Sequence, residues 1–122
     1  MKLIDSNILI YSGEARFAPT LLPFVTNPAN YVSAVSQVEA LGFHRITPAQ
    51  ISFFESLFLV LQILPIDRDV IEQAIKVRQV KKVSLGDALI AATALVHGLE
   101  LVSRNTADSS GIPGLVIVNP IP

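Results

Sequence analysis

Residues 1–11 read MKLIDSNILIY, and the segment KLID (2–5) in this stretch gives the first indication of the fold. Its apolar pair, Leu3 and Ile4, is typical of a short buried strand, and a carboxylate, Asp5, stands at the end of that strand. Similar apolar runs recur at YVSA (31–34), QILPI (62–66), LELVS (99–103) and LVIV (115–118). We expect these five runs to be strands.

Longer helical patterns separate the predicted strands. They are APTLLPFVTN (18–27), VSQVEALGFHRI (35–46), TPAQISFFESLFLVL (47–61), DRDVIEQAIKVRQVKK (67–82) and SLGDALIAATALVHG (84–98). This alternation predicts an α/β fold, with a central parallel sheet of about five strands and helices on both faces. Ligands bind such sheets at the carboxyl ends of the strands, which is where Asp5 stands.

The composition indicates one domain, residues 1–122, and excludes several classes of protein. Nine basic and ten acidic residues give a net charge of −1, which excludes a broadly basic nucleic-acid-binding surface but not a local patch. The absence of cysteine excludes a disulfide framework and a thiolate metal site. No segment has the pattern of a membrane span or a signal peptide, so we expect a soluble cytoplasmic protein.

Most familiar catalytic motifs are also missing from the sequence. His44 and His97 lack a second metal ligand at helical spacing, so a zinc site is not predicted. The glycines of SSGIPG (109–114) belong to a turn and form no phosphate-binding loop, and no serine lies in a G-x-S-x-G motif. The carboxylates are the remaining candidates for chemistry.

Three carboxylates stand in apolar surroundings, namely Asp5, Glu39 and Asp87. Each has a purely structural alternative. Asp5 can form a turn through its own side chain, whereas Glu39 and Asp87 lie three residues after Ser36 and Ser84, which is the spacing of a helix capping box. If the three acids instead meet at one edge of the sheet, their repulsion amounts to several kcal/mol, roughly 4 kcal/mol for a pair 4 Å apart. A hard cation such as Mg²⁺ or Mn²⁺ would neutralise them.

The chain resembles the PIN-domain ribonucleases, in particular the VapC-like toxins of bacterial toxin–antitoxin pairs. The resemblance covers nearly the whole sequence and rests on LIDSNILIY (3–11), SAVSQVEALGF (33–43) and the long segment from SLGDALIAATALVHG through LVSRN to LVIVNP (84–120). It implies a single PIN-like domain and a metal-dependent endoribonuclease. Asp5, Glu39 and Asp87 would hold one Mg²⁺ or Mn²⁺ ion, or two.

The resemblance also implies roles for polar neighbours of the acids. Asn7 and Ser103 match positions that orient acids and waters around the metal. For Asn7, an ordinary turn residue is an equally good interpretation. Many members carry a fourth acid where this chain has Asn105, with Asp108 three residues later. Asn105 can hold a water or a phosphate oxygen but brings no charge, which leaves a second metal ion open.

RNA binding by a nearly neutral chain needs local basic residues. The candidates are Arg45, Lys76, Arg78, Lys81, Lys82 and Arg104. Arg104 is expected to meet a phosphate because it lies beside Asn105, and Lys82 is a second substrate-binding candidate. For the run from Lys76 to Lys82, a solvated helix end is an equally good interpretation.

The segment SFFESLFLVL (52–61) is apolar on more than one side of its predicted helix. Phe53 and Leu59 make this helix apolar on more than one side. The face expected in the core consists of Phe54, Leu57, Phe58 and Leu61. Exposed apolar surface marks interfaces. The resemblance assigns this region to a cognate antitoxin and also implies a homodimer.

Two other classes of function compete with the nuclease. A non-catalytic PIN-like module that binds RNA or protein would explain Asn105, but not the retention of Asp5, Glu39 and Asp87. A receiver-like phosphoacceptor domain would need an aspartate at the end of a middle strand and a late lysine. The sequence offers neither, because Asp67 starts a helix and no lysine follows Lys82.

Overall fold

The computed structural model describes residues 1–104 and 106–122, apart from the side chains of residues 108 and 109. Its centre is a sheet of five parallel strands: β1 (Lys2–Ile4), β2 (Tyr31–Ser33), β3 (Gln62–Leu64), β4 (Glu100–Val102) and β5 (Ile117–Val118). The strand order is β3-β2-β1-β4-β5, so β1 lies in the middle. The predicted α/β fold with five parallel strands is confirmed.

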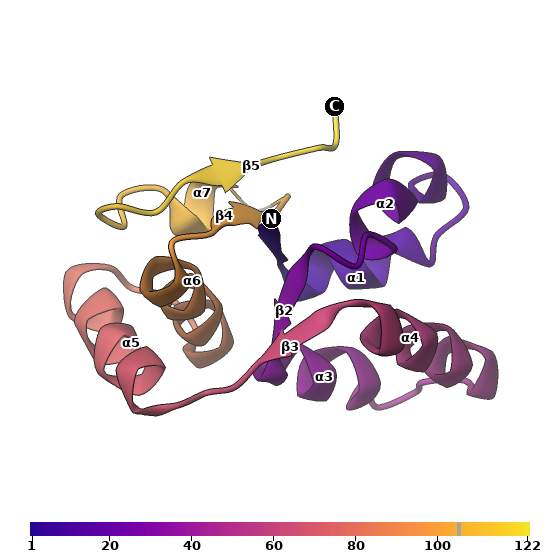
Figure 1. The fold of residues 1–122 in the computed structure, drawn as a ribbon, viewed down its shortest axis with the longest axis horizontal. Helices are drawn as coiled ribbons and strands as arrows, with labels where there is room; N and C mark the ends of the chain where they lie inside the picture. Colours follow the sequence, from indigo (N-terminus) through magenta and orange to yellow (C-terminus); the bar gives the residue numbers. More distant parts are fainter. Residues whose placement is uncertain (105) are drawn as a thin grey trace.

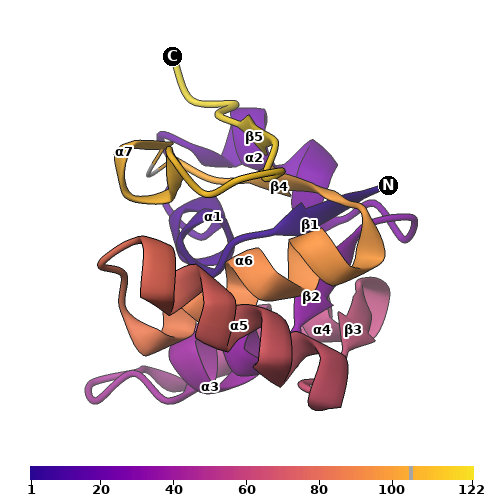
Figure 2. The same cartoon turned by 90° about the vertical axis from the view of Figure 1, so that its left-hand side faces the viewer.

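Helices cover both faces of the sheet, as the sequence predicts (Figure 1). One layer contains α1 (Ser6–Ser12), α2 (Ala18–Val25), α3 (Ala34–Leu41) and α4 (Pro48–Val60). The opposite layer contains α5 (Arg68–Val80) and α6 (Leu85–His97), which pack side by side in front of the strands in Figure 2. A single short turn, α7 (Thr106–Ser109), follows β4.

Successive side chains of β1 point to opposite faces of the sheet, so the strand contributes to the hydrophobic core on both sides. Leu3 packs into a cluster with Ile90 and Ala94 of α6, whereas Ile4 faces the opposite core with Ile8 of α1. Leu3, Ile4 and Ile8 are fully buried. A strand buried on both faces reads as a continuous apolar run, which is why KLI predicts it correctly.

Several predicted helix ends are present. Thr47 and Gln50 form a complete capping box, in which the Thr47 hydroxyl accepts from the Gln50 N–H at 3.2 Å and the Gln50 side chain accepts from the Thr47 N–H at 2.9 Å. Pro48 occupies the first position of α4. Gly98 ends α6 with a φ of 64°, a conformation that favours glycine.

Three elements differ from the sequence prediction. The pattern at 35–46 predicts one long helix, but α3 ends at Leu41 and Gly42 follows as its C-cap. The helix α1 is not predicted, because its seven residues are too few for a helical period to stand out beside the strand before it. The single turn of α7 is likewise too short to leave a pattern.

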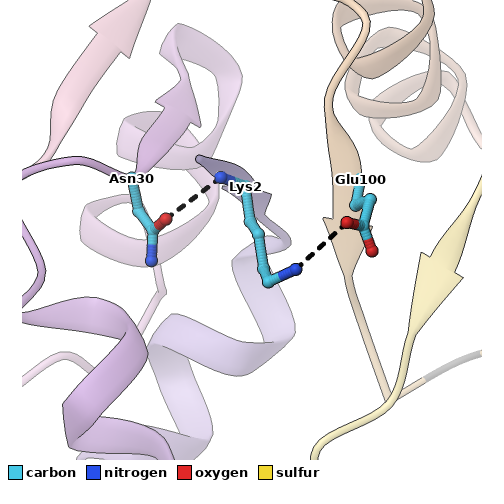
Figure 3. A network of polar contacts seen from close by, with 3 residues as sticks. All are labelled: Lys2, Asn30 and Glu100. Atoms are coloured by element: carbon cyan, nitrogen blue, oxygen red, sulfur yellow. Dashed lines mark hydrogen bonds and ion pairs between the residues drawn. The ribbon is translucent and has the colours of Figure 1, made fainter.

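Lys2 connects three strands at the amino end of the sheet, opposite the edge where Asp5 lies (Figure 3). Its backbone N–H donates to the Asn30 side chain at 3.0 Å, and its ammonium group lies 3.2 Å from the Glu100 carboxylate. Asn30 directly precedes β2, and Glu100 begins β4. These contacts help to fix the register of β1 against both neighbours.

None of the helices in the described part of the chain is both long enough and apolar enough to cross a membrane.

Candidate active site

Asp5 lies at the carboxyl edge of the sheet, between β1 and α1. Its backbone N–H continues the strand ladder by donating to the Val102 carbonyl at 2.9 Å. Asp5 is the N-cap residue of α1, yet its side chain makes no capping hydrogen bond, so the interpretation of Asp5 as a turn-forming residue is not supported. Its carboxylate, in a residue only 7% exposed, accepts a 2.7 Å hydrogen bond from the Ser103 hydroxyl at the end of β4.

Glu39 approaches the same edge from α3. The capping-box alternative for Glu39 is wrong, because α3 is capped by Ser33, whose hydroxyl accepts from the Val35 N–H. Ser36 is instead buried, with its hydroxyl 2.8 Å from the Ser6 hydroxyl. The Ser6 oxygen is also 2.9 Å from the Glu39 carboxylate. Since a hydroxyl has one proton and a carboxylate only accepts, Ser36 donates to Ser6 and Ser6 donates to Glu39.

Asp87 stands in the first turn of α6, on the opposite layer of helices. Its N–H donates to the Ser84 hydroxyl at 3.1 Å, so half of the capping box is present. The reciprocal bond from the Ser84 N–H to the Asp87 carboxylate is not found among the described residues. The Asp87 side chain is therefore not committed to capping its own helix.

The contact between α3 and α6 brings Glu39 beside the residue that precedes Asp87. A methyl group at Gly86 would lie 2.8 Å from a carboxylate oxygen of Glu39. A methyl group there would force the Glu39 carboxylate to move, so the absence of a side chain at position 86 leaves room for this carboxylate in its present position. The first turn of α6 is also the positive end of the helix dipole, which favours a negative charge there.

Two other carboxylates, those of Glu39 and Asp87, contribute to the electrostatics of Asp5. The pKa of Asp5 is raised from 3.8 to about 6. Burial is the largest cause, and the negative charges of Asp87 and Glu39 add to it, against hydrogen bonds from the Ser103 hydroxyl and the Ser6 backbone N–H that lower it. Side chains 34 and 82 residues away along the chain are thus close enough to act on Asp5. That the three acids converge on one shared site at this edge stays a prediction.

The chemistry of these donors fits a hard divalent cation. Carboxylate oxygens are the ligands that Mg²⁺ and Mn²⁺ prefer, and Mg²⁺ is commonly held by one or two carboxylates with waters completing its shell. Among the residues that the structure describes, no three histidine or acidic side chains are already grouped closely enough to hold an ion. The metal site formed by Asp5, Glu39 and Asp87 therefore stays a prediction.

The polar residues that the sequence places around the acids have different outcomes. Ser103 is buried and bonded to Asp5. Asn7 lies half-buried in the first turn of α1 and makes no side-chain hydrogen bond within the described ranges, so its role stays a prediction. Asn105 and the side chain of Asp108 lie outside the described residues.

Arg104 and Lys82 are both exposed. The guanidinium carbon of Arg104 lies 5.0 Å from the centre of the Tyr11 ring and 5.3 Å from that of Phe17. Lys82 lies between α5 and α6 and makes no side-chain hydrogen bond or ion pair in the described part of the chain. Its neighbour Lys81 donates to the Ala107 carbonyl at 2.9 Å and to the carbonyl of the residue that follows α7, so Lys81 holds that segment against α5.

Three residues of the site escape sequence reasoning. Ser6, Ser36 and Gly86 position the Glu39 carboxylate, although no sequence motif marks any of them as a functional residue. Ser36 reads as a helix cap and Gly86 as an ordinary residue in a helix start. The only signal is the polar pair Ser6-Asn7 directly after Asp5, which interrupts two apolar runs.

Comparisons with known proteins identify relatives along the whole chain. A family model described as PIN domain matches residues 2–107. A solved toxin–antitoxin complex from Klebsiella pneumoniae contains a chain that is 35% identical, with a TM-score of 0.79 and coverage of 99% of this chain and 98% of that one. A comparison with curated proteins found no match.

Two more distant structures share the fold. A chain in the DNA-bound VapBC complex from Salmonella typhimurium is 19% identical, with a TM-score of 0.82 and coverage of 99% of both chains. A chain in FitAcB from Neisseria gonorrhoeae is 24% identical, with a TM-score of 0.79 and coverage of 98% of both chains. Together with the family match, these structures rule out the receiver-like alternative.

Proposed function

The chain belongs to the PIN domain family, and from this premise we propose that it is a VapC-like toxin, an endoribonuclease that hydrolyses RNA with the help of Mg²⁺ or Mn²⁺. The observation that carries the proposal is the position of Asp5. It is buried at the carboxyl edge of the sheet, bonded to Ser103, and under the influence of two further carboxylates. Burial of a carboxylate such as Asp5 costs folding free energy, and a buried acid with a raised pKa is typical of functional sites.

In this proposal, Asp5, Glu39 and Asp87 hold the cation. The ion would supply Lewis-acid chemistry, which lowers the pKa of a water and stabilises negative charge on the phosphate. Ser103 holds the Asp5 carboxylate in one orientation, and the Ser36–Ser6 pair does the same for Glu39. Both carboxylates are thereby fixed in place before RNA binds.

Water is the attacking group in this mechanism, and the ribose 2′-hydroxyl takes no part. The products should therefore carry 5′-phosphate and 3′-hydroxyl ends. RNA in which the 2′-hydroxyls are replaced by 2′-O-methyl groups distinguishes the two routes, because cleavage by water does not need the 2′-hydroxyl as a nucleophile. Products with 2′,3′-cyclic phosphate ends would contradict the proposal.

The direct test compares the parent with Asp5→Asn and Asp87→Asn on RNA in the presence of Mn²⁺. Both variants should lose cleavage, since each removes a charge that the cation needs. Asp69→Asn, at an exposed position on α5, is the matched control and should cut at the parent rate. Cleavage by Asp5→Asn and Asp87→Asn at the parent rate would place the active site elsewhere. A parent protein that binds RNA in the presence of Mn²⁺ without cleaving it would favour the non-catalytic binding module.

We further propose that an antitoxin segment occupies an apolar groove between α1, α3 and α4. The groove encloses about 600 Å³, and its walls include Ile10, Phe43, Phe53 and Phe54. Phe43 is 56% exposed there, a position that is unfavourable for a large apolar residue without a partner. The related chain from Klebsiella pneumoniae is part of a toxin–antitoxin complex, which supports a partner of this kind.

The groove refines the earlier prediction for α4. Phe53 lines it, whereas Leu59 is 88% exposed and lies outside it. Phe43→Asp should therefore abolish co-purification with the product of the adjacent gene, and Leu59→Asp should leave co-purification intact. The opposite pattern would place the antitoxin on the outer face of α4. Homodimer formation is a separate part of the proposal, and analytical ultracentrifugation of the chain alone tests it.

A further inference from the structure

Two aromatic rings and an arginine cluster beside the acidic site. Tyr11, in the last turn of α1, and Phe17, at the start of α2, meet edge to face with ring centres 5.4 Å apart. Arg104 lies over both rings, at 5.0 Å from Tyr11 and 5.3 Å from Phe17. These three residues, called the Arg104 platform below, come from segments far apart in the sequence.

The two rings of the Arg104 platform pack against the protein core, whereas Arg104 itself is exposed to solvent. Tyr11 and Phe17 are half-buried and pack against the core between the sheet and α1–α4. Arg104 is exposed, and its guanidinium has no carboxylate partner among the residues that the structure describes. Arg16, which also lies over Phe17 at 4.4 Å, differs because it is paired with Glu14 at 3.5 Å. Arg104 is therefore exposed to solvent, and no carboxylate in the described part of the chain neutralises its charge.

The backbone places this platform next to the acids. Arg104 directly follows Ser103, whose hydroxyl is 2.7 Å from the Asp5 carboxylate. Tyr11 lies six residues after Asp5 on the helix that Asp5 caps, which is roughly 9 Å along the helix axis. A polynucleotide with a phosphate at the acids thus has its neighbouring nucleotide within reach of the platform.

We propose that Arg104, supported by Tyr11 and Phe17, stacks on an unpaired base of single-stranded RNA next to the bond that is cut. Proteins that bind single-stranded RNA place bases on aromatic rings and on guanidinium planes, and such stacking tolerates any base because every base has a π face. The inference rests on the proposed ribonuclease activity and extends it to a binding site. It also assigns Arg104 a role other than the simple phosphate contact that its position in the sequence suggests.

Lysine in place of arginine separates the two roles of Arg104. Arg104→Lys keeps the positive charge, so a phosphate contact survives, but it removes the flat surface on which a base stacks. Arg104→Ala removes both. Arg68→Lys, at an exposed position on α5, is the matched control for the chemical change. Tyr11→Leu is the second variant, because leucine fills core volume without an aromatic face, and melting curves show whether each variant folds.

The experiment measures RNA binding without cleavage, in the Asp87→Asn background and with Mn²⁺ omitted. The probes are fluorescent single-stranded oligoribonucleotides of one sequence, either intact or with an abasic site at each position in turn, and the readout is anisotropy at fixed salt. In the background protein, one abasic position should weaken binding by roughly tenfold, the loss typical of one stacked base. Arg104→Lys, Arg104→Ala and Tyr11→Leu should each reduce this ratio to near one, whereas Arg68→Lys should preserve it.

The outcomes distinguish this inference from the proposed function. If Arg104→Lys keeps the tenfold ratio, Arg104 is a phosphate contact or a tether of its loop, and the stacking site is refuted. If no abasic position weakens binding while the parent protein cleaves RNA with Mn²⁺, the stacking site is again refuted but the nuclease stands. If the protein neither binds nor cleaves RNA, both fall together.

Discussion

Replacing Asp5 by asparagine should stabilise the metal-free protein at neutral pH while abolishing its activity. The folded protein raises the pKa of Asp5 from 3.8 to about 6, so it holds the proton more tightly than the unfolded chain does. Folding is therefore favoured by this group below about pH 4, and the stability falls as pH rises through about 6. At pH 7.5 the buried, charged carboxylate therefore destabilises the folded protein, and a neutral amide at position 5 would remove this destabilisation.

The size of the effect follows from the shift in pKa. A rise from 3.8 to about 6 corresponds to about 3 kcal/mol at 1.36 kcal/mol per pK unit, which is an upper bound for the gain in Asp5→Asn at pH 7.5. An amide oxygen still accepts from Ser103, but more weakly than a carboxylate, so we expect a gain of about 1–2 kcal/mol. For a domain of this size that raises the melting temperature by about 5 °C or somewhat more.

Calorimetric melting with EDTA present at pH 4 and pH 7.5 is the assay. The two proteins should melt together at pH 4, where Asp5 is protonated in the folded state, and the variant should melt higher at pH 7.5. Asp69→Asn is the control, and loss of a first-turn acid from α5 should lower its melting temperature slightly. A lower melting temperature for Asp5→Asn at pH 7.5 would refute the argument that burial and repulsion strain this carboxylate.

Three further predictions follow from the same contacts. Affinity for Mn²⁺ should rise between pH 5 and pH 7, because Asp5 must release its proton before it can bind the ion. Calorimetric titrations in two buffers of different ionisation heat should detect that proton. An affinity that does not change with pH would show that Asp5 is not a ligand. Ser6→Ala should slow cleavage roughly tenfold, because Glu39 loses the hydroxyl that orients it, with little loss of fold by circular dichroism; an unchanged rate would make the serine pair merely structural. Thr47→Ala should cost about 1 kcal/mol in urea unfolding by breaking the capping box of α4, yet leave the cleavage rate unchanged, and a slower rate would tie α4 to the active site.

The architecture is largely readable from the sequence because its signals are local. A strand buried on both faces needs a run of apolar residues, and KLI, YVS and ELV supply one each. Thr47-Pro48 and Gly98 mark helix ends through the chemistry of a single turn. The helix α1 carries no such local signal, because its seven residues follow directly after a strand and are too few to show a helical period.

The site was readable only in part, because its contacts join distant segments. The position of Asp5 follows from the parallel sheet, which places strand ends at one edge. The spacing of Ser36 and Glu39 instead suggests a capping box, and only the packing of α1 against α3 shows that Ser36 serves Ser6. Likewise, nothing local predicts that Arg104 lies over Tyr11, since 93 residues separate them.

Titration with Mn²⁺, followed by calorimetry and by RNA cleavage on the same samples, tests the central claim most directly. That claim is that Asp5, Glu39 and Asp87 share one divalent ion and cut RNA with it. The parent should bind Mn²⁺ and cleave in proportion to its occupancy, and Asp87→Asn should lose both together. Tight Mn²⁺ binding by Asp87→Asn, or cleavage by the parent in excess EDTA, would contradict it.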